Sequence, residues 1–215
     1  MSTKNGFSRF VAGYGRLTLL MIPIGIAINF IGGQIAVLLK LPIYLDSIGT
    51  ILVGALCGGI PGALVGGISN ILNSITSPTN IPYAILSIIF GLLAGWFSRM
   101  GVFRSLWKTL LSSLAFAAVG GGLGAIITLI LFGGLSAGGM GVIVGIVHAA
   151  GMDLNLANFL VAIPADVVDK VPTVLIVYVI LKRMPKRLFA KLPLGSVYLQ
   201  KTPKRGVVSE PSSIS

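Results

Sequence analysis

A succession of apolar stretches along almost the whole chain constrains this protein more than any other feature. Clusters of glycine, proline and charged residues separate six of them, at about residues 17–39, 44–58, 60–76, 82–98, 108–133 and 157–181. A helix needs about 20 apolar residues to cross a bilayer, so the 215 residues accommodate six spans joined by short loops. The sequence therefore predicts an all-α integral membrane protein, folded as a bundle of six transmembrane helices.

The low content of charged residues excludes a soluble globular enzyme. Only 10% of the residues are charged, against about 25% in a typical soluble domain. The first apolar stretch is about 23 residues long, which exceeds the 7–15 residues of a signal peptide's apolar region. No small-residue cleavage pattern ends this stretch, so we expect it to be retained as the first span.

The lysines and arginines are distributed asymmetrically between the two ends of the predicted spans. With six spans, 14 of the 16 basic residues fall on one side, and the exceptions are Lys40 and Lys170. Basic loops stay in the cytoplasm, so both termini are predicted to be cytoplasmic. We expect a cytoplasmic N-terminus (1–16), a membrane domain (17–183) and a basic, disordered cytoplasmic tail (184–215). The net charge of +11 lies at the membrane edges, so it does not indicate a nucleic-acid partner.

Glycines four residues apart predict close helix crossings. Association between helices in lipid relies on close packing through small residues, and the chain has 29 glycines. The pairs are Gly54 with Gly58, Gly62 with Gly66, Gly91 with Gly95, and Gly141 with Gly145. The glycine-rich segment 134–155 leaves three possibilities open: a loop, a short interfacial helix, or part of another span.

Charged residues interrupt the last apolar stretch, where they are costly. Asp166 and Lys170 are four residues apart, on one face of a helix, in the favourable acid-before-base order. Ionisable residues inside a span indicate a functional site by default. Two interpretations remain open: a structural ion pair, or participation in a solute site, which the additional Asp169 favours.

A second set of polar residues converges on the outer side of the predicted bundle. Amides, hydroxyls and aromatic rings around an apolar cavity are typical of a small-molecule pocket. Together with Asp166 and Lys170, the predicted solute-binding residues are Gln34, Tyr44, Asp46, Asn70, Asn73, Asn80, Tyr83 and Asn158.

The sequence gives no sign of a catalytic, metal or cofactor site. His148 is the only histidine and Cys57 the only cysteine, too few ligands for a metal centre. Neither a GxSxG elbow nor a GxxxxGK[ST] phosphate loop occurs. The chain is therefore predicted not to be an enzyme, and concentrative uptake must draw its energy from a partner or a gradient.

Three motifs resemble the substrate-binding S component of energy-coupling factor (ECF) transporters. They are Leu-Pro-Ile-Tyr-Leu-Asp-Ser-Ile-Gly-Thr at 41–50, Gly-Gly-Ile-Pro-Gly-Ala-Leu-Val-Gly-Gly-Ile-Ser-Asn at 58–70, and Ile-Pro-Ala-Asp-Val-Val-Asp-Lys at 163–170. The last is similar to a P-x-D-x-x-x-K pattern that opens the final helix of the family. The resemblance extends over most of residues 15–185.

The resemblance implies a multi-pass protein of the cell membrane that captures a vitamin-like or nucleoside-like micronutrient from outside. Such a subunit docks on a module of one transmembrane coupling subunit and two ATPases, and topples in the bilayer to release its solute inside. The family's docking stripe in the first span reads AxxxA; here Pro23 and Ala27 stand at the corresponding spacing.

Two other functions remain open. A stand-alone secondary carrier would use Asp166, Asp169 and Lys170 as a proton relay. A membrane sensor or assembly protein would bind partners through its glycine faces and basic tail.

Overall fold

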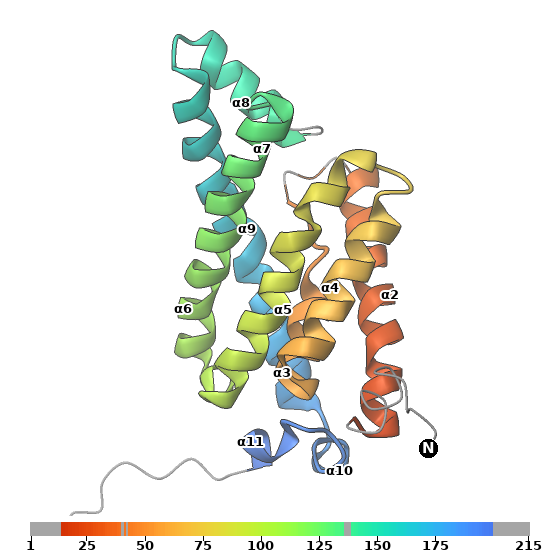
Figure 1. Ribbon diagram of the computed structural model, residues 1–215. Coiled ribbons are helices and arrows are strands. Elements are labelled where there is room, and N and C mark those ends of the chain that lie inside the picture. Colours follow the sequence, from red (N-terminus) through yellow and green to blue (C-terminus); the bar gives the residue numbers. More distant parts are fainter. Residues whose placement is uncertain (1–13, 40, 42, 136–138, 200–215) are drawn as a thin grey trace, which may run out of the picture.

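The computed structural model describes residues 14–39, 41, 43–135 and 139–199, and these residues form a bundle of helices (Figure 1). In chain order the elements are α2 (Arg16–Leu38), α3 (Ile48–Cys57), α4 (Gly59–Asn73), η1 (Pro78–Tyr83), α5 (Ala84–Arg99), η2 (Val102–Arg104), α6 (Leu106–Ala117), η3 (Ala118–Leu123), α7 (Gly124–Phe132), α8 (Gly139–Ala149), α9 (Leu154–Arg183), α10 (Lys186–Phe189) and α11 (Gly195–Leu199). The all-α prediction is confirmed.

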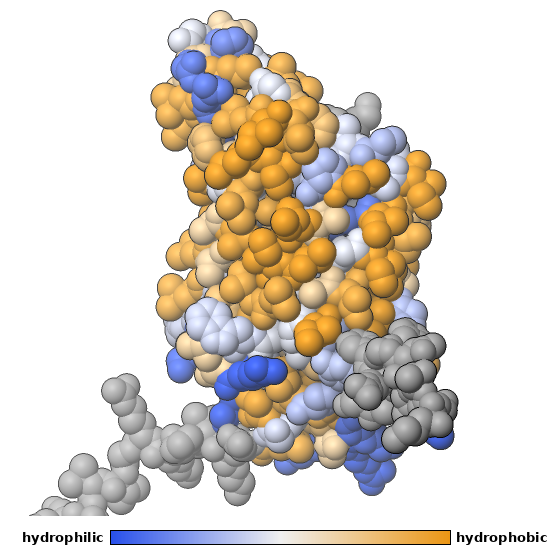
Figure 2. All heavy atoms as spheres, in the orientation of Figure 1, coloured by the Kyte–Doolittle hydropathy of each residue, from blue (hydrophilic) through white to orange (hydrophobic). Residues whose placement is uncertain are grey.

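Three helical segments within the described residues are long and apolar enough to cross a membrane: Arg16–Leu38, Pro78–Arg99 and Leu106–Phe132. Their outer faces carry large exposed apolar side chains, such as Leu20, Trp107 and Ile130. Figure 2 shows apolar residues over most of the side of the molecule, with hydrophilic residues gathered mainly towards its ends. The hydropathy of the helices thus indicates a multi-pass membrane protein in contact with lipid.

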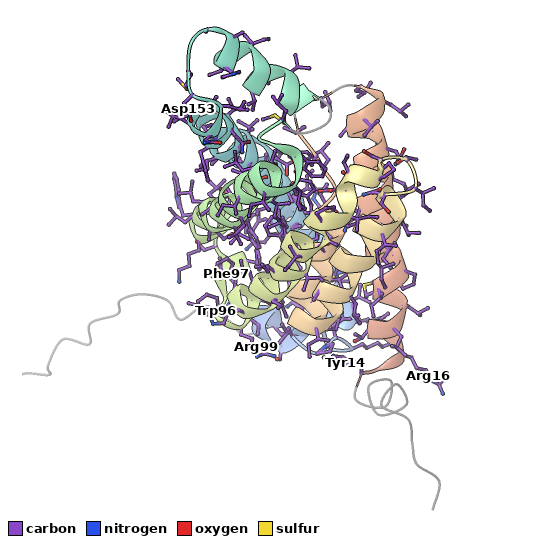
Figure 3. All side chains as sticks on the ribbon, turned by 45° about the horizontal axis from the view of Figure 1, so that its top comes forward. Tyr14, Arg16, Trp96, Phe97, Arg99 and Asp153 are labelled. Atoms are coloured by element: carbon purple, nitrogen blue, oxygen red, sulfur yellow. The ribbon has the colours of Figure 1, made fainter. Side chains whose placement is uncertain are left out.

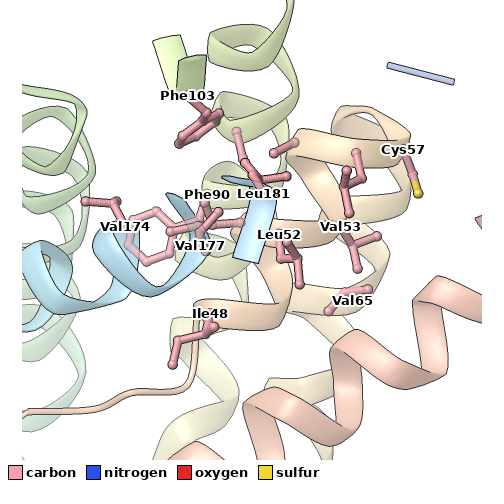
Figure 4. Packing of buried hydrophobic residues seen from close by; sticks show 14 of the residues in the cluster. Ile48, Leu52, Val53, Cys57, Val65, Phe90, Phe103, Val174, Val177 and Leu181 are labelled. Atoms are coloured by element: carbon pink, nitrogen blue, oxygen red, sulfur yellow. The ribbon is translucent and has the colours of Figure 1, made fainter. Parts of the chain in front are cut away.

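Helices α2 to α5 pack together on one side of the molecule, and α6, η3, α7 and α9 pack together on the other (Figure 1). Buried apolar side chains from α3, α5 and α9 meet between the two groups, among them Leu52, Phe90, Val177 and Leu181 (Figure 4). Short helices α10 and α11 lie beneath the end at which α2 begins and α9 ends.

The second apolar stretch forms a shorter helix than predicted. Helix α3 begins only at Ile48, and its 10 residues span about 15 Å, half of a bilayer core. The preceding residues 43–47 are not helical, and Leu45 has a positive φ of 51°. The reason is tertiary: Asp169 of α9 accepts hydrogen bonds from the backbone N–H groups of Tyr44 and Leu45, which holds these residues out of a helix.

Glycines allow the close crossings of α3, α4 and α5 that the sequence predicts. A Cβ atom at Gly62 would lie 2.6 Å from the Cα of Gly54, and one at Gly95 would lie 2.6 Å from the Cα of Gly59. Gly91 packs equally closely on the backbone of α4. At Gly145, in contrast, a Cβ atom would meet nothing within 4 Å, so this glycine makes no close crossing within the described residues.

The prediction of a disordered tail from residue 184 is wrong for its first part. The N–H of Leu194 donates to the carbonyl of Leu56 at 3.0 Å, and the hydroxyl of Tyr198 lies 2.8 Å from that of Ser98. Apolar residues in this segment, such as Phe189, are buried against the bundle. Helix α3 ends at the sharp turn around Gly58, and the tail supplies partners for its last carbonyls. Residues 200–215 lie outside the described part of the chain.

Segment 134–155, for which three possibilities were open, contains helix α8. The helix precedes α9 at the end of the molecule opposite α10 and α11 (Figure 1).

A buried amide joins the first three helices. Asn29 of α2 is fully buried, and its Nδ2 donates to the hydroxyls of Thr50 at 2.7 Å and Ser69 at 3.1 Å. Its Oδ1 accepts from the backbone N–H of Gly49 at 2.7 Å. The side chain therefore also satisfies an N–H group at the beginning of α3, which has no partner within its own helix.

Replacing Asn29 with alanine is expected to destabilise the protein by about 2–4 kcal/mol, because several buried hydrogen bonds are lost and their partners are left unsatisfied. Thermal unfolding of the purified protein in detergent measures the effect. Gln34→Ala on the same helix is the control: Gln34 makes one exposed hydrogen bond of 3.3 Å, to Thr76, and we expect little change. Equal melting temperatures for the two variants would contradict the role of Asn29.

Candidate functional site

A cavity of about 120 Å³ lies between α5 on one side and η3, α7, α8 and α9 on the other. By volume it holds several waters or a small organic molecule. Its lining comprises Tyr44, Asp46, Asn70, Thr79, Asn80, Tyr83, Leu86, Ser87, Phe90, Gly120, Gly121, Gly124, Thr128, Phe132, Met140, Val144, Asn158, Ala162, Ala165, Asp166 and Lys170.

The cavity is in the half of the bundle remote from the basic residues. Arg16 and Arg99 lie at one end of the molecule, and Asp153 lies at the other (Figure 3). Apart from Lys170, the basic residues of the described chain stand at the beginnings of α2 and α6, at the end of α5, between α5 and α6, or from the end of α9 onwards. The lining includes η1 and α8, which belong to the opposite end.

A buried lysine stands at the base of the cavity. Lys170 is 2% exposed, and its ammonium donates to Asp169 and lies 3.5 Å from the Oδ1 of Asp166. The same ammonium is 4.8 Å from the centre of the Phe90 ring on α5. A buried charge is tolerated only when it is paired, and here two carboxylates and an aromatic face surround it.

Asp169 serves the structure of the bundle. Its Oδ1 accepts hydrogen bonds from the backbone of Tyr44 at 2.8 Å and of Leu45 at 2.9 Å, and its Oδ2 accepts from Lys170. Both carboxylate oxygens are therefore occupied, and the side chain is fully buried. Asp169 is the principal counter-ion of Lys170 and the anchor of the segment before α3.

Asp166 is placed differently, because one of its oxygens has no partner. The residue is 5% exposed and lines the cavity, and its Oδ2 makes no hydrogen bond. Buried polar atoms are almost always hydrogen-bonded; this oxygen is one of four exceptions among the described residues, and Asp166 is the one of these residues that lines the cavity.

A distortion of the neighbouring helix makes room for this carboxylate. Between α6 and α7 the chain forms one π-helical segment, η3, whose sequence is Ala-Val-Gly-Gly-Gly-Leu; such π-bulges frequently occur at functional sites. A Cβ atom at Gly120 would lie 2.0 Å from the Oδ2 of Asp166. Glycine is therefore the residue that allows Asp166 its present position.

Two buried amides and a hydroxyl form the polar walls. The Nδ2 of Asn70 donates to the hydroxyl of Ser87 at 2.5 Å, and the Nδ2 of Asn158 donates to the carbonyl of Ala125 at 2.9 Å. Both amide groups are oriented by these bonds. Their Oδ1 atoms accept no hydrogen bond from the described residues.

Aromatic residues close the cavity near η1. The hydroxyl of Tyr83 lies 2.7 Å from that of Thr128 on α7, and the Tyr83 ring stacks on Phe132 with 6.2 Å between ring centres. These contacts join the beginning of α5 to the end of α7 across the cavity.

The structure gathers eight of the ten predicted solute-binding residues around this cavity: Tyr44, Asp46, Asn70, Asn80, Tyr83, Asn158, Asp166 and Lys170. Gln34 and Asn73 are not among its lining, and their placement in the site is corrected. Gln34 bonds to Thr76 on the outside of the bundle, and Asn73 packs against Gly33. Both belong to the interface of α2 with α4 and its following loop, because α2 packs on α4 and not on the cavity.

Sequence reasoning omitted several residues from the site. In the sequence, Asp169 is recognisable only as a third charged residue beside Asp166 and Lys170, and nothing indicates its hydrogen bonds to the segment before α3. Phe90 and Gly120 gave no signal of their own, because each is an ordinary residue of an apolar span until the fold brings it against Lys170 or Asp166.

The predicted docking residues Pro23 and Ala27 are exposed on the outer face of α2, together with Leu20 and Ile24. Asn29, on the opposite face, is buried in the bundle. This separates an outward apolar face of α2 from its inward packing face.

The part of the chain described here contains no group of three or more His, Cys, Asp or Glu residues able to hold a metal, and His148 hydrogen-bonds to the carbonyl of Met152. The chain matches no known family model, no curated protein and no solved structure. What distinguishes the cavity is a set of fixed polar groups in an apolar enclosure, the composition of a small-molecule site.

Gly120→Ala is expected to displace the Asp166 carboxylate and lower the stability by about 1–3 kcal/mol, the usual cost of overpacking. Gly122→Ala is the matched control in the same π-helical segment, because a Cβ atom there meets nothing within 4 Å. Thermal unfolding of both variants tests this, and a similar loss in both would refute the proposed contact.

Asp169→Asn and Asp166→Asn are expected to differ in stability. Asp169→Asn removes the main counter-ion of Lys170 and should cost about 3 kcal/mol, since breaking a buried ion pair leaves a charge uncompensated. Asp166→Asn leaves Lys170 paired with Asp169. It should lower the free energy of unfolding by under about 1 kcal/mol, because the Oδ2 of Asp166 makes no hydrogen bond that the substitution could break. The melting temperatures of the two variants provide the comparison; the reverse order would assign the structural role to Asp166.

Proposed function

We propose that this protein is a solute-binding subunit of a membrane importer, the S component of an ECF-type transporter, which takes up a vitamin-like or nucleoside-like micronutrient. The observation that carries the proposal is Asp166, a buried residue that lines the cavity and has one carboxylate oxygen without a hydrogen-bond partner. Buried polar atoms without a partner also occur at Thr18, Ser47 and Asn73, but of the four residues only Asp166 lines the cavity. A donor group of a bound solute would give its carboxylate a partner.

The course of the chain supports six membrane passes in this proposal. The passes are α2, the segment 41–57 with α3 as its second half, α4, η1 with α5, α6 to α7, and α9. Non-helical backbone at membrane depth is tolerated where it is buried in protein or lines a cavity, and Tyr44 and Asp46 line this one.

The charge asymmetry supports the orientation. Basic residues mark the cytoplasmic side, which places the end with Arg99 and Lys182 inside the cell and the half with the cavity towards the outside. A solute entering from outside then reaches Asp166 before it reaches the cytoplasmic half of the bundle.

Energy for uptake is proposed to come from partners. The sequence has no phosphate-binding loop, so a coupling subunit with two ATPases would drive release after docking. The exposed face of α2 around Pro23 and Ala27 is the proposed docking surface, since it is apolar and separate from the packing face of the same helix.

Mass spectrometry of small molecules released from the full-length protein, purified from native membranes, tests the proposal. We expect a near-stoichiometric solute in the wild type and at least a several-fold loss in Asp166→Asn. Asp153→Asn is the control, because Asp153 caps α9 and asparagine is an equally good helix cap.

Three outcomes distinguish the candidate functions. A solute together with co-purified ATPase subunits supports the importer subunit. A solute whose uptake into proteoliposomes collapses with the proton gradient, without ATPase partners, would indicate the secondary carrier. The absence of any solute, even after supplying vitamins and nucleosides, would favour a sensor or assembly protein.

A further inference from the structure

We infer that the solute is a small organic cation whose N–H groups bind to the carboxylate of Asp166. This inference rests on the proposed function and adds the chemical class of the solute.

The charges around the cavity do not balance. Asp46 and Asp166 line the cavity, and Asp169 lies directly behind it, whereas Lys170 is the one basic residue among the lining. Three carboxylates against one ammonium leave a formal excess of two negative charges. Isolated charges are costly to bury, and a cationic solute would neutralise part of this excess.

The single ammonium is not available to an anionic solute. Lys170 already donates to Asp169, lies 3.5 Å from Asp166 and faces the Phe90 ring. A phosphate or carboxylate ligand would have to displace two carboxylates from it and bring further negative charge beside Asp46. The arrangement therefore disfavours anions.

The hydrogen-bonding groups of the walls accept more than they donate. The Oδ2 of Asp166 is unpartnered. Asn70 uses its Nδ2 to donate to Gly66 and Ser87, and Asn158 uses one N–H of its Nδ2 for Ala125, which leaves both Oδ1 oxygens as acceptors. A donor-rich group such as an ammonium, amidinium or aminopyrimidine matches this set. A carboxylate accepts a bidentate pair of N–H donors particularly well.

The aromatic residues favour the same class of solute. Tyr83 and Phe132 stack on each other at the wall of the cavity, and Tyr44 lies beside Asp46 in the sequence and in the lining. Cations are attracted to the faces of aromatic rings, and flat rings stack on them. Together with the acidic centre, this wall suits a small planar or alkylated cation.

Three probes of nearly the same shape test the charge preference: benzamidinium (cationic), benzamide (neutral) and benzoate (anionic). Their affinities for the full-length protein in lipid nanodiscs are measured at pH 7 by calorimetry. We expect benzamidinium to bind at least about tenfold more tightly than benzamide, because a hydrogen bond to a charged group is worth more than one between neutral groups. Benzoate should bind most weakly.

Asp166→Asn should lower the affinity for benzamidinium by about tenfold, through loss of the charge-assisted hydrogen bond, and leave that for benzamide nearly unchanged. Asp153→Asn, which does not change a lining residue, should alter neither. The cation inference is overturned if benzamide or benzoate binds as well as benzamidinium, if Asp166→Asn leaves the benzamidinium affinity unchanged, or if no probe binds. The first two results leave a solute site, and with it the proposed function, intact; the failure of all probes together with the absence of a native solute would remove both.

Discussion

The ion pairs of the buried Lys170 with Asp169 and Asp166 organise the centre of the structure. The charge of Lys170 in an apolar bundle requires counter-ions, and Asp169 and Asp166 on the same helix supply them. Because Asp169 also accepts hydrogen bonds from the backbone of Tyr44 and Leu45, the charged centre holds the segment before α3 out of a helix. It thereby shortens one helix, fixes α9 against α3 and α5, and creates the floor of the cavity.

Two kinds of contact hold the surrounding bundle together. Lipid offers no hydrophobic reason for helices to associate, so close packing and hydrogen bonds take that role. Glycines bring α3, α4 and α5 into backbone contact, and Asn29 ties α2 to α3 and α4 with bonds that a bilayer cannot replace. In the η3 segment, Gly121 packs on the backbone of α9, whereas the neighbouring Gly120 leaves space for the carboxylate of Asp166. The cavity thus lies beside a glycine that accommodates a side chain.

The two neighbouring carboxylates of the charged motif in α9 have different surroundings. Asp169 has a partner for each oxygen and belongs to the structural ion pair. Asp166 contributes to the same pair with one oxygen, and its other oxygen is buried beside Gly120 without a hydrogen-bond partner. The sequence places the two residues three positions apart on one helix and therefore cannot distinguish them. The distinction arises from the segment before α3, which donates to Asp169, and from η3, which packs against Asp166.

The helical class, the apolar segments and the uneven distribution of basic residues can be predicted from the sequence, and eight of the ten residues proposed for the solute site line the cavity. These follow from composition and spacing, because the cost of polar groups in a bilayer restricts where they occur. Only the tertiary structure decided that Gln34 and Asn73 face another interface, that α3 is a half-length helix, and that residues up to 199 fold against the bundle. Each of these depends on a hydrogen bond or contact between residues far apart in the chain, and the periodicity of a single segment carries no information about such partners.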